Sequence, residues 1–418
     1  MRRLVVALVL LVPAPAVADD PTIKVGGLLD VRYARTDDTR SWLDGGLGKL
    51  RYGAGVNGRA NLVRLSQVSL LLDAELTPVL TAHVQLNADA EPDEAGLRSR
   101  ADLVEAFVLY RPELSEKVRL RLRGGAFFPP ISLEHEGPAW TSAYTITGSA
   151  ANSWIGEEVR TVGAEGTLVL KWDRDEARLT GAGFGSNDPA GTLLGWRGWS
   201  LHDRQTGFGD RLAYPEIPGM GPGLPFDRNA RWVEPLVEID GRIGWYAGAT
   251  VKRSGTYEAR ALRYDNRGDR TVFDGKQYAW QTHFNAFGLR VELPGRIHLL
   301  GQCLKGETYM GQTPTGDAAV EVPFRAAYGL VSVPVRRHRL SVRYDWFRTE
   351  DEDVMTELDP NDEDGSAWTA CYAFEAAKGL RFAAEVIRVE SDRTVRPLLG
   401  GPRHAEETLL QLSWRTSF

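Results

Sequence analysis

The stretch from Glu406 to Phe418, EETLLQLSWRTSF, alternates apolar and polar residues up to the end of the chain. Because successive side chains of a β-strand point to opposite faces, this alternation predicts a strand with one apolar and one polar face. The apolar face carries Leu410, Leu412, Trp414 and Phe418, and the polar face carries Gln411, Ser413 and Arg415. A soluble sheet that packs on a core and a sheet that faces lipid both fit the pattern.

The position of Phe418 favours the second of these. The chain stops on an aromatic residue at the end of the apolar face. In this it resembles the last strand of bacterial outer-membrane β-barrels, a family whose C-terminal Phe is read by the assembly machinery. The resemblance implies a membrane barrel built from strands of this kind.

The other end of the chain predicts export. Residues 1–18, MRRLVVALVLLVPAPAVA, combine a positive start, an apolar core and a small-residue cleavage site, as a secretory signal peptide does. The apolar run from Leu4 to Val12 is shorter than the roughly 20 residues that a spanning helix needs. We therefore expect residues 1–18 to be removed and residues 19–418 to form a single β-barrel domain in the bacterial outer membrane.

Charge and cysteine content exclude several classes. The net charge of -6 gives no basic footprint for nucleic acid. Only Cys303 and Cys371 occur in 418 residues, so an exported fold of this size is not held together by disulfides. The two cysteines lie on candidate strands that are not neighbours, and we expect free thiols.

Alternating segments recur along the whole chain. Most are about ten residues or longer, the length that a tilted strand needs to cross a bilayer. Seventeen candidates are found, and closed single-chain bacterial barrels have an even number of strands, so the sequence predicts an all-β, antiparallel, up-and-down transmembrane barrel of 16 or 18 strands. The candidates are 25–35, 67–76, 80–89, 102–111, 118–127, 158–170, 175–185, 232–241, 243–253, 256–265, 278–293, 296–308, 322–335, 338–349, 366–377, 379–390 and 406–418.

Connections alternate between short and long, which is typical of barrels with short periplasmic turns and long external loops. The predicted periplasmic turns are Thr77-Pro78, Arg111 to Lys117, Gly241-Arg242, Leu293 to Gly295, Val335 to His338 and Lys378-Gly379. The predicted external loops are 36–61, 89–100, 128–157, 186–231, 265–277, 308–321 and 350–365. Both ends of the mature chain then lie on the periplasmic side.

One candidate strand carries a ladder of arginines. Its alternation places Arg119, Arg121 and Arg123 inward, and the strand 338–349 adds inward Arg339 and Arg343, with Asp345 close by. Anion-conducting pores use such basic groups, so these five are the predicted pore-lining residues. In the alternative interpretation, acidic partners such as Glu105 or Glu165 pair with the arginines, which then brace the wall.

The segment after this ladder is the predicted constriction loop. It begins with the rigid Pro129-Pro130 and carries Glu134, Glu136, Trp140, Tyr144 and Trp154. Loops of this length inside a domain are usually functional. In place and length it resembles the third external loop of general porins, which folds inward and narrows the pore; the alternative is a plain surface loop.

Two other long loops are interpreted more simply. Loop 186–231, which holds Trp196, Trp199 and His202, is expected to use its aromatic residues for its own packing rather than to contact a sugar or anion. Loop 350–365 is acidic but lacks the ligand spacing of a calcium loop, so a solvated loop is expected. No nucleophile elbow, zinc motif or P-loop occurs, and no histidine pair has metal-ligand spacing, so neither enzyme, metal nor cofactor is predicted.

Together these features predict a porin-like channel in the outer membrane, through which small polar solutes diffuse passively. The inward arginines add the hypothesis of anion preference. They resemble the phosphate-selective group of porins, although the lysine-rich loop pattern of that group is absent. The resemblance also implies outer-membrane lipids as partners and a homotrimer. A barrel enzyme of lipase or protease type and a non-conducting structural or adhesion barrel are the alternatives.

Overall fold

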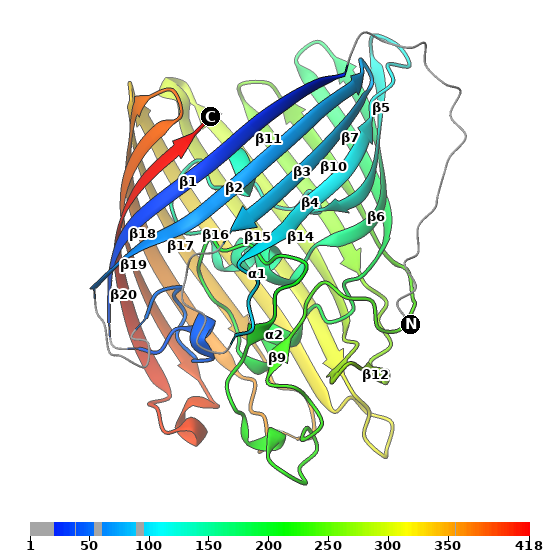
Figure 1. The fold of residues 1–418 in the computed structure, drawn as a ribbon, viewed down its shortest axis with the longest axis vertical. Coiled ribbons are helices and arrows are strands. Elements are labelled where there is room, and N and C mark those ends of the chain that lie inside the picture. The colour runs from blue at the N-terminus through cyan, green and yellow to red at the C-terminus, as the bar shows by residue number, and fades with distance from the viewer. Residues whose placement is uncertain (1–20, 38, 54–60, 89–95, 356) are drawn as a thin grey trace.

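The computed structural model describes residues 21–37, 39–53, 61–88, 96–355 and 357–418, so the predicted signal peptide lies outside the described residues. Sixteen antiparallel strands form a closed barrel, with each strand bonded to its neighbour and β20 bonded back to β1 (Figure 1). The strands are β1 (Thr22–Thr36), β2 (Asn61–Thr77), β3 (Leu80–Ala88), β4 (Ala101–Tyr110), β5 (Val118–Phe127), β6 (Thr161–Trp172), β7 (Asp175–Gly185), β10 (Gly244–Arg253), β11 (Tyr257–Asp265), β14 (Gln281–Leu293), β15 (Ile297–Met310), β16 (Val320–Val335), β17 (His338–Thr349), β18 (Glu363–Ala377), β19 (Leu380–Arg393) and β20 (His404–Ser417). The prediction of 16 or 18 strands is confirmed at 16.

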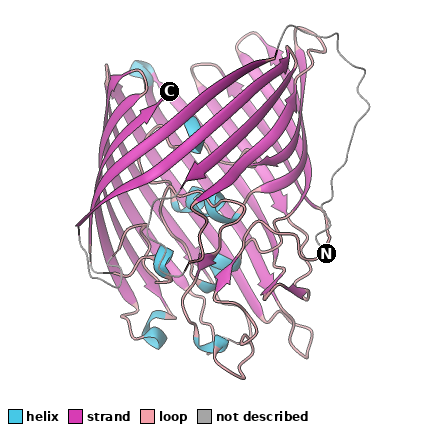
Figure 2. Ribbon diagram, in the orientation of Figure 1, coloured by secondary structure: helices cyan, strands magenta, loops and turns pink. Residues whose placement is uncertain are grey.

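The connections between strands hold all remaining elements (Figure 2). At the turn end of the barrel, upper in Figure 1, short connections join the strands, β1 begins and β20 ends. At the loop end the long connections gather. The elements outside the barrel wall are α1 (Ala150–Glu158), α2 (Thr192–Trp196), β8 (Leu212–Ala213), β9 (Trp232–Val233), β12 (Phe273–Asp274), β13 (Gln277–Tyr278), η1 (Trp42–Asp44), η2 (Pro138–Trp140), η3 (Pro218–Met220), η4 (Pro294–Arg296) and η5 (Arg396–Leu399). None of the helices in the described ranges has the length and apolar character to span a bilayer.

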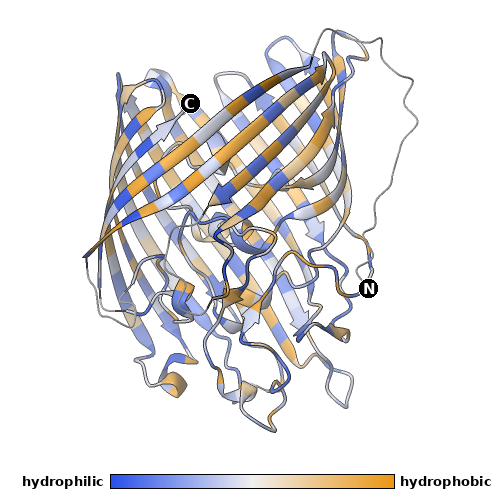
Figure 3. Ribbon diagram, viewed as in Figure 1, coloured by the Kyte–Doolittle hydropathy of each residue, from blue (hydrophilic) through white to orange (hydrophobic). Residues whose placement is uncertain are grey.

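The strand alternation separates an apolar outer wall from a polar inner wall, visible as alternating bands along the strands (Figure 3). On β20, Leu412 and Trp414 are each 48% exposed on the outer wall, whereas Gln411 is 1% exposed on the inner wall. Further aromatic residues, among them Trp172, Trp245 and Trp368, are exposed on the outside. Such a belt of apolar and aromatic side chains is what a barrel presents to lipid.

Gly27 lies where the two ends of the barrel meet. The backbones of Gly27 and Phe418 exchange two hydrogen bonds, with N···O distances of 3.1 and 3.2 Å. The aromatic ring of Phe418 lies so close that a Cβ on Gly27 would meet its Cζ at 2.5 Å. Glycine accommodates the ring where it lies, whereas a larger residue would displace it.

Two sequence predictions are wrong at the loop end. The candidate strand 232–241 is not part of the barrel: only Trp232–Val233 is extended, and it pairs with β8 in a small hairpin. Consequently Gly241-Arg242 is not a periplasmic turn but lies at the loop end, just before β10. Val233 is fully buried among apolar loop residues. Because packing between loops also requires apolar residues, the sequence here shows the same pattern as a strand. Cys303 and Cys371 are free thiols, as expected.

Candidate functional site in the barrel lumen

The segment between β5 and β6, residues 128–160, folds into the barrel. Every residue of its helix α1 is buried, and α1 lies against β16 and β17. In the ring of sixteen, β17 stands eight places from β5, so the segment crosses the lumen to the opposite wall. Figure 1 shows α1 within the outline of the barrel. Ser149 begins the helix by accepting a hydrogen bond from the Asn152 N–H, a common N-cap. We call residues 128–160 the lumen loop.

Arg343 on β17 holds the lumen loop by charge. Its side chain has no exposed surface, and its Nε donates to Asp345 Oδ2 at 2.7 Å. Its Nη1 lies 3.2 Å from Glu134 of the loop, and its two terminal nitrogens donate to the carbonyls of Thr147 and Gly148. Although burial opposes ionisation of Glu134, Arg343 keeps the pKa of this carboxyl below its ordinary value.

A second anchor lies on the neighbouring wall. The carboxylate of Glu385 on β19 accepts hydrogen bonds from the backbone N–H groups of Ile146 at 2.6 Å and Thr147 at 3.0 Å. Gln411 on β20 donates to Glu385 at 2.9 Å and to the Thr147 hydroxyl at 2.7 Å. Glu385 and Gln411 are each 1% exposed. The loop is therefore bonded to side chains of three strands on one side of the barrel, β17, β19 and β20.

Apolar side chains fill the space between α1 and the loop-end half of the wall. Trp154 on α1 contacts Phe284, Phe324 and Trp199 edge-on, with ring centroids 5.2 to 6.1 Å apart. Its indole N–H donates to Glu158 at 2.6 Å. Aromatic contacts of this geometry add to the stabilisation from burial. At this level the interior is occupied by packed side chains.

The residues predicted to form the constriction take several positions on this loop. Glu134, Tyr144 and Trp154 are buried against the β14–β17 wall. Trp140 stacks between His135 and Phe128, with centroids 3.7 and 4.3 Å away. Glu136 binds Arg290 on β14, and the Arg339 guanidinium lies 5.4 Å from the Tyr144 ring. The inward position excludes a plain surface loop, whereas the narrowing of a pore stays a prediction.

The predicted arginine ladder lies on β5 and faces the interior of the barrel. Its three arginines differ in their partners. Arg123 binds Glu165 on β6 at 2.9 Å and the Phe128 carbonyl, which is the bracing role of the alternative interpretation. Arg119 binds Glu113 at 3.1 Å. Arg121 makes no ion pair with any described residue. Glu105, the other expected partner, instead accepts the N–H of Phe128.

The loop 186–243 covers the lumen loop from the loop end, and sequence reasoning missed the contact between them. Arg197 binds Glu157 of α1 through both oxygens, at 2.5 and 3.0 Å, and His202 lies 3.2 Å from the same carboxylate. Burial opposes ionisation of Glu157, yet Arg197 lowers its pKa to about 2. Trp196 and Trp199 are both 1% exposed, which confirms the expected packing role; Trp196 packs within its own loop, whereas Trp199 packs on Trp154 of the lumen loop. The partners are far apart in sequence, and no local pattern links them.

Cavities open at both mouths of the barrel. At the loop end a cavity of about 890 Å³ lies between loops, and a pocket of about 30 Å³ beside Arg51 and Asp203 lies near it. At the turn end a cavity of about 350 Å³ lies between residues 137–143 of the lumen loop and the wall that carries Arg339, Arg381 and Arg415. The lumen loop therefore stands between two basic vestibules.

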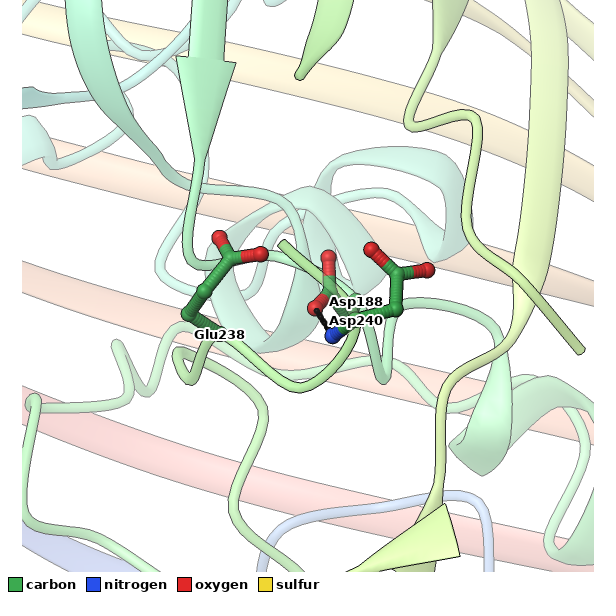
Figure 4. Close-up of side chains that lie close together, drawn as sticks. All are labelled: Asp188, Glu238 and Asp240. Carbon is green, nitrogen blue, oxygen red and sulfur yellow. Dashed lines mark hydrogen bonds between the residues drawn. The ribbon is translucent and has the colours of Figure 1, made fainter. Parts of the chain in front are cut away.

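Three carboxylates at the loop end, Asp188, Glu238 and Asp240, have oxygens within 4.8 Å of one another (Figure 4). Burial, with the charges of the other two, raises the pKa of Asp188 to about 7. Such oxygens are ligands that Ca²⁺ accepts. In this structure they accept backbone N–H groups, among them those of Asp240 and Gly241. We assign no ion to them.

The acidic loop 350–362 differs from the solvated loop expected from the sequence. Asp353 and Asp359 are buried, at 9% and 0% exposure. Burial and the neighbouring charges of Asp353 and Asp351 raise the pKa of Asp359 to about 9. Net acidity indicates exposure in most loops, but here the loop folds back over its own carboxyl groups.

One side-chain pair in the lumen loop resembles part of a catalytic group. The Ser132 Oγ lies 2.8 Å from His135 Nδ1. The same oxygen accepts the backbone N–H groups of Glu134 and His135, which is a local turn motif. Burial lowers the pKa of His135 to about 4, and the Glu134 carboxylate is engaged by Arg343 and Ser149. The expectation that the protein is not an enzyme stays a prediction.

The closed barrel of sixteen strands, its lipid-compatible outer wall and its inward loop define the class of bacterial outer-membrane β-barrels, and they place the chain in the outer membrane, with the turn end periplasmic. Among solved structures, the chain is similar to the outer membrane channel DcaP of Acinetobacter baumannii, with a TM-score of 0.59 and 9% identity over 95% of this chain and 97% of that one. It is also similar to in-vitro folded OmpT, an outer membrane protein of Vibrio cholerae, with a TM-score of 0.52 and 8% identity over 96% of this chain and 98% of that one. At such identities the likeness shows the fold. No protein-family model and no curated protein sequence matches the chain.

Proposed function

We propose that the protein is a porin-like channel through which small polar solutes diffuse passively across the outer membrane, and that it prefers anions. The observation that carries the proposal is the lumen loop, which crosses a polar lumen and is bonded to the far wall by Arg343 and Glu385. A loop fixed inside a barrel sets the width of the passage and presents its charges to a passing solute. One structural neighbour, DcaP, is described as a channel.

Anion preference rests on Arg121. It lies on the inner wall of the periplasmic half, between Arg119 on its own strand and Thr167 across on β6, and it has no ion pair in the described part of the chain. Arg178 on β7 adds a positive charge near it, which Glu176, the ion-pair partner of Arg178, offsets in part. An unpaired guanidinium on the wall of a water-filled passage attracts anions. Phosphate is one such anion to test.

The test is the reversal potential of the reconstituted barrel with Arg121→Gln. The substitution removes one charge and retains most of the side-chain length, so the anion-to-cation permeability ratio should fall. Arg348→Gln is the matched control, because Arg348 lies on the outer wall and is 46% exposed. A reversal potential that is the same for the wild type and Arg121→Gln would sink the anion hypothesis.

A non-conducting barrel is the second candidate, and the packed aromatic cluster around Trp154 favours it. Such a barrel serves envelope structure or adhesion and carries no current after correct insertion.

We further propose that the porin-like channel forms a homotrimer, as the resemblance to porins implies. Cross-linking in native membranes would test it: a band at three times the monomer mass supports the trimer, and a monomer band alone opposes it.

A further inference from the structure

The loop-end cavity has the dimensions of a small-molecule site. Its volume of about 890 Å³ lies within the range of roughly 300–1,000 Å³ that is typical of ligand pockets. Four separate stretches of loop build its walls: residues 39–48, 97–98, 211–232 and 396–405. Four separate segments of the external mouth therefore form the cavity together, and it is not a gap beside one loop.

Apolar residues are the largest group in the walls. Half of the 24 lining residues are apolar, including Trp42, Tyr214 and Leu399. The Tyr214 hydroxyl donates to the Ala230 carbonyl, so this side chain offers its ring to the cavity and not an unpaired polar group. Leu399 is 39% exposed, which leaves an apolar contact surface available. Apolar walls of this extent stabilise the ring or chain of a ligand by removing it from water.

The charged groups of the cavity are predominantly basic. Five arginines line it against two carboxylates, Asp44 and Glu216. Glu216 is already bound by Arg231 at 2.5 Å. Arg40, in contrast, is exposed, and its side chain makes no hydrogen bond or ion pair with the described part of the chain. Gly45 ends η1 at a φ of 73° and carries no side chain beside the Arg40 guanidinium, so a ligand can approach this cation.

We propose that the loop-end cavity binds an organic anion that combines one acidic group with an apolar, ring-sized body. The acidic group pairs with Arg40, and the body packs on the wall of Tyr214 and Leu399. The inference rests on the proposed function in one respect: it names the class of solute that the channel carries. The site itself requires only the cavity.

The floor of the cavity connects the site to the lumen loop. The Trp42 ring lies 4.6 Å from the guanidinium carbon of Arg197 and 4.5 Å from the His202 ring. Arg197 and His202 both contact Glu157 of α1. A ligand in the cavity therefore stands directly above the ion pairs that cover α1, which is the position of a solute collected before it enters the lumen.

The probes are phenylacetate and three compounds that each lack one feature: neutral 2-phenylethanol, cationic phenethylamine, and acetate without the ring. Binding to the folded full-length barrel is measured by isothermal titration calorimetry in detergent, with detergent alone as the reference. We expect phenylacetate to bind at least about tenfold more tightly than each of the others, because each comparison removes one favourable interaction of roughly 1.4 kcal/mol.

Variants separate the two parts of the site. Arg40→Gln should weaken phenylacetate about tenfold and leave 2-phenylethanol unchanged, whereas Leu399→Ser should weaken both. Arg267→Gln is the control, because Arg267 is an exposed arginine of another external loop, outside the cavity. Equal affinities for phenylacetate and 2-phenylethanol, or an unchanged affinity in Arg40→Gln, would overturn the site. If phenylacetate binds but the barrel carries no current, the site is supported and the channel is refuted. If the barrel carries current but phenylacetate does not bind, the channel is supported and the site is refuted.

Discussion

Arg343 on the barrel wall and Glu134 on the lumen loop are 209 residues apart in sequence, yet their charged groups lie 3.2 Å apart with no exposed surface on either side chain. Removing one member of a buried ion pair leaves the other charge without compensation, which costs about 3–5 kcal/mol. Arg343 also donates to two loop carbonyls. Arg343 is therefore a main anchor of the docked lumen loop, beside the hydrogen bonds that Glu385 makes to the loop backbone.

Arg343→Gln should release the lumen loop. We expect larger or noisier current steps in planar bilayers and faster proteolytic cleavage within residues 128–160, because the buried Glu134 loses its partner. Arg348→Gln is the control on the same strand, on the outer face. Current traces and cleavage rates that match the wild type would contradict the anchoring role of Arg343.

Cys371 is a built-in reporter of loop position. It is 1% exposed and packs with Ile146 of the lumen loop, Ala373 and Ala383. In a Cys303→Ser background it is the only thiol, and it should react slowly with a water-soluble maleimide. When Arg343→Gln is added to this background, the labelling reaction should become at least about tenfold faster. A loss of only about 1.4 kcal/mol of docking energy raises the fraction of molecules with an undocked loop tenfold. Fast labelling without the Arg343 substitution would show that the loop does not cover Cys371.

Because the carboxyl of Asp359 is buried, we expect the loop 350–362 to become less stable at high pH. Its carboxyl has a pKa of about 9 in the folded loop against 3.8 as the ordinary value. Between these values the folded state holds a proton that the unfolded state has lost, so stability decreases as pH rises from about 4 to about 9. Hydrogen exchange in this loop should be faster, relative to the intrinsic rate, at pH 9 than at pH 6.

Two substitutions test the source of this pH dependence. Asp359→Asn stays neutral and should flatten the dependence, whereas Glu357→Gln alters an exposed carboxyl in the same loop and should leave it unchanged. Equal slopes in the wild type and Asp359→Asn would show that the pH response comes from elsewhere, for example from Asp351, whose pKa is raised to about 6 by burial.

Sequence alternation predicts the barrel wall well because the side-chain period of a strand is a local property. Leu412 and Gln411 lie on the expected outer and inner walls. The same reasoning fails for residues 232–241, because loop residues such as Val233 are apolar for packing between loops. It also fails for the anchors of the lumen loop: Arg343 was expected to line the lumen, and nothing near it in sequence indicates that Glu134 and Gly148 cover it.

The most direct test of the proposed function is single-channel conductance of the refolded barrel in a planar bilayer under a salt gradient. We predict steady ohmic steps with a reversal potential whose sign indicates anion preference. Absence of steps from protein shown to be inserted would contradict the channel and favour the non-conducting barrel. Steps with a cation-selective reversal potential would retain the channel and refute the role assigned to Arg121.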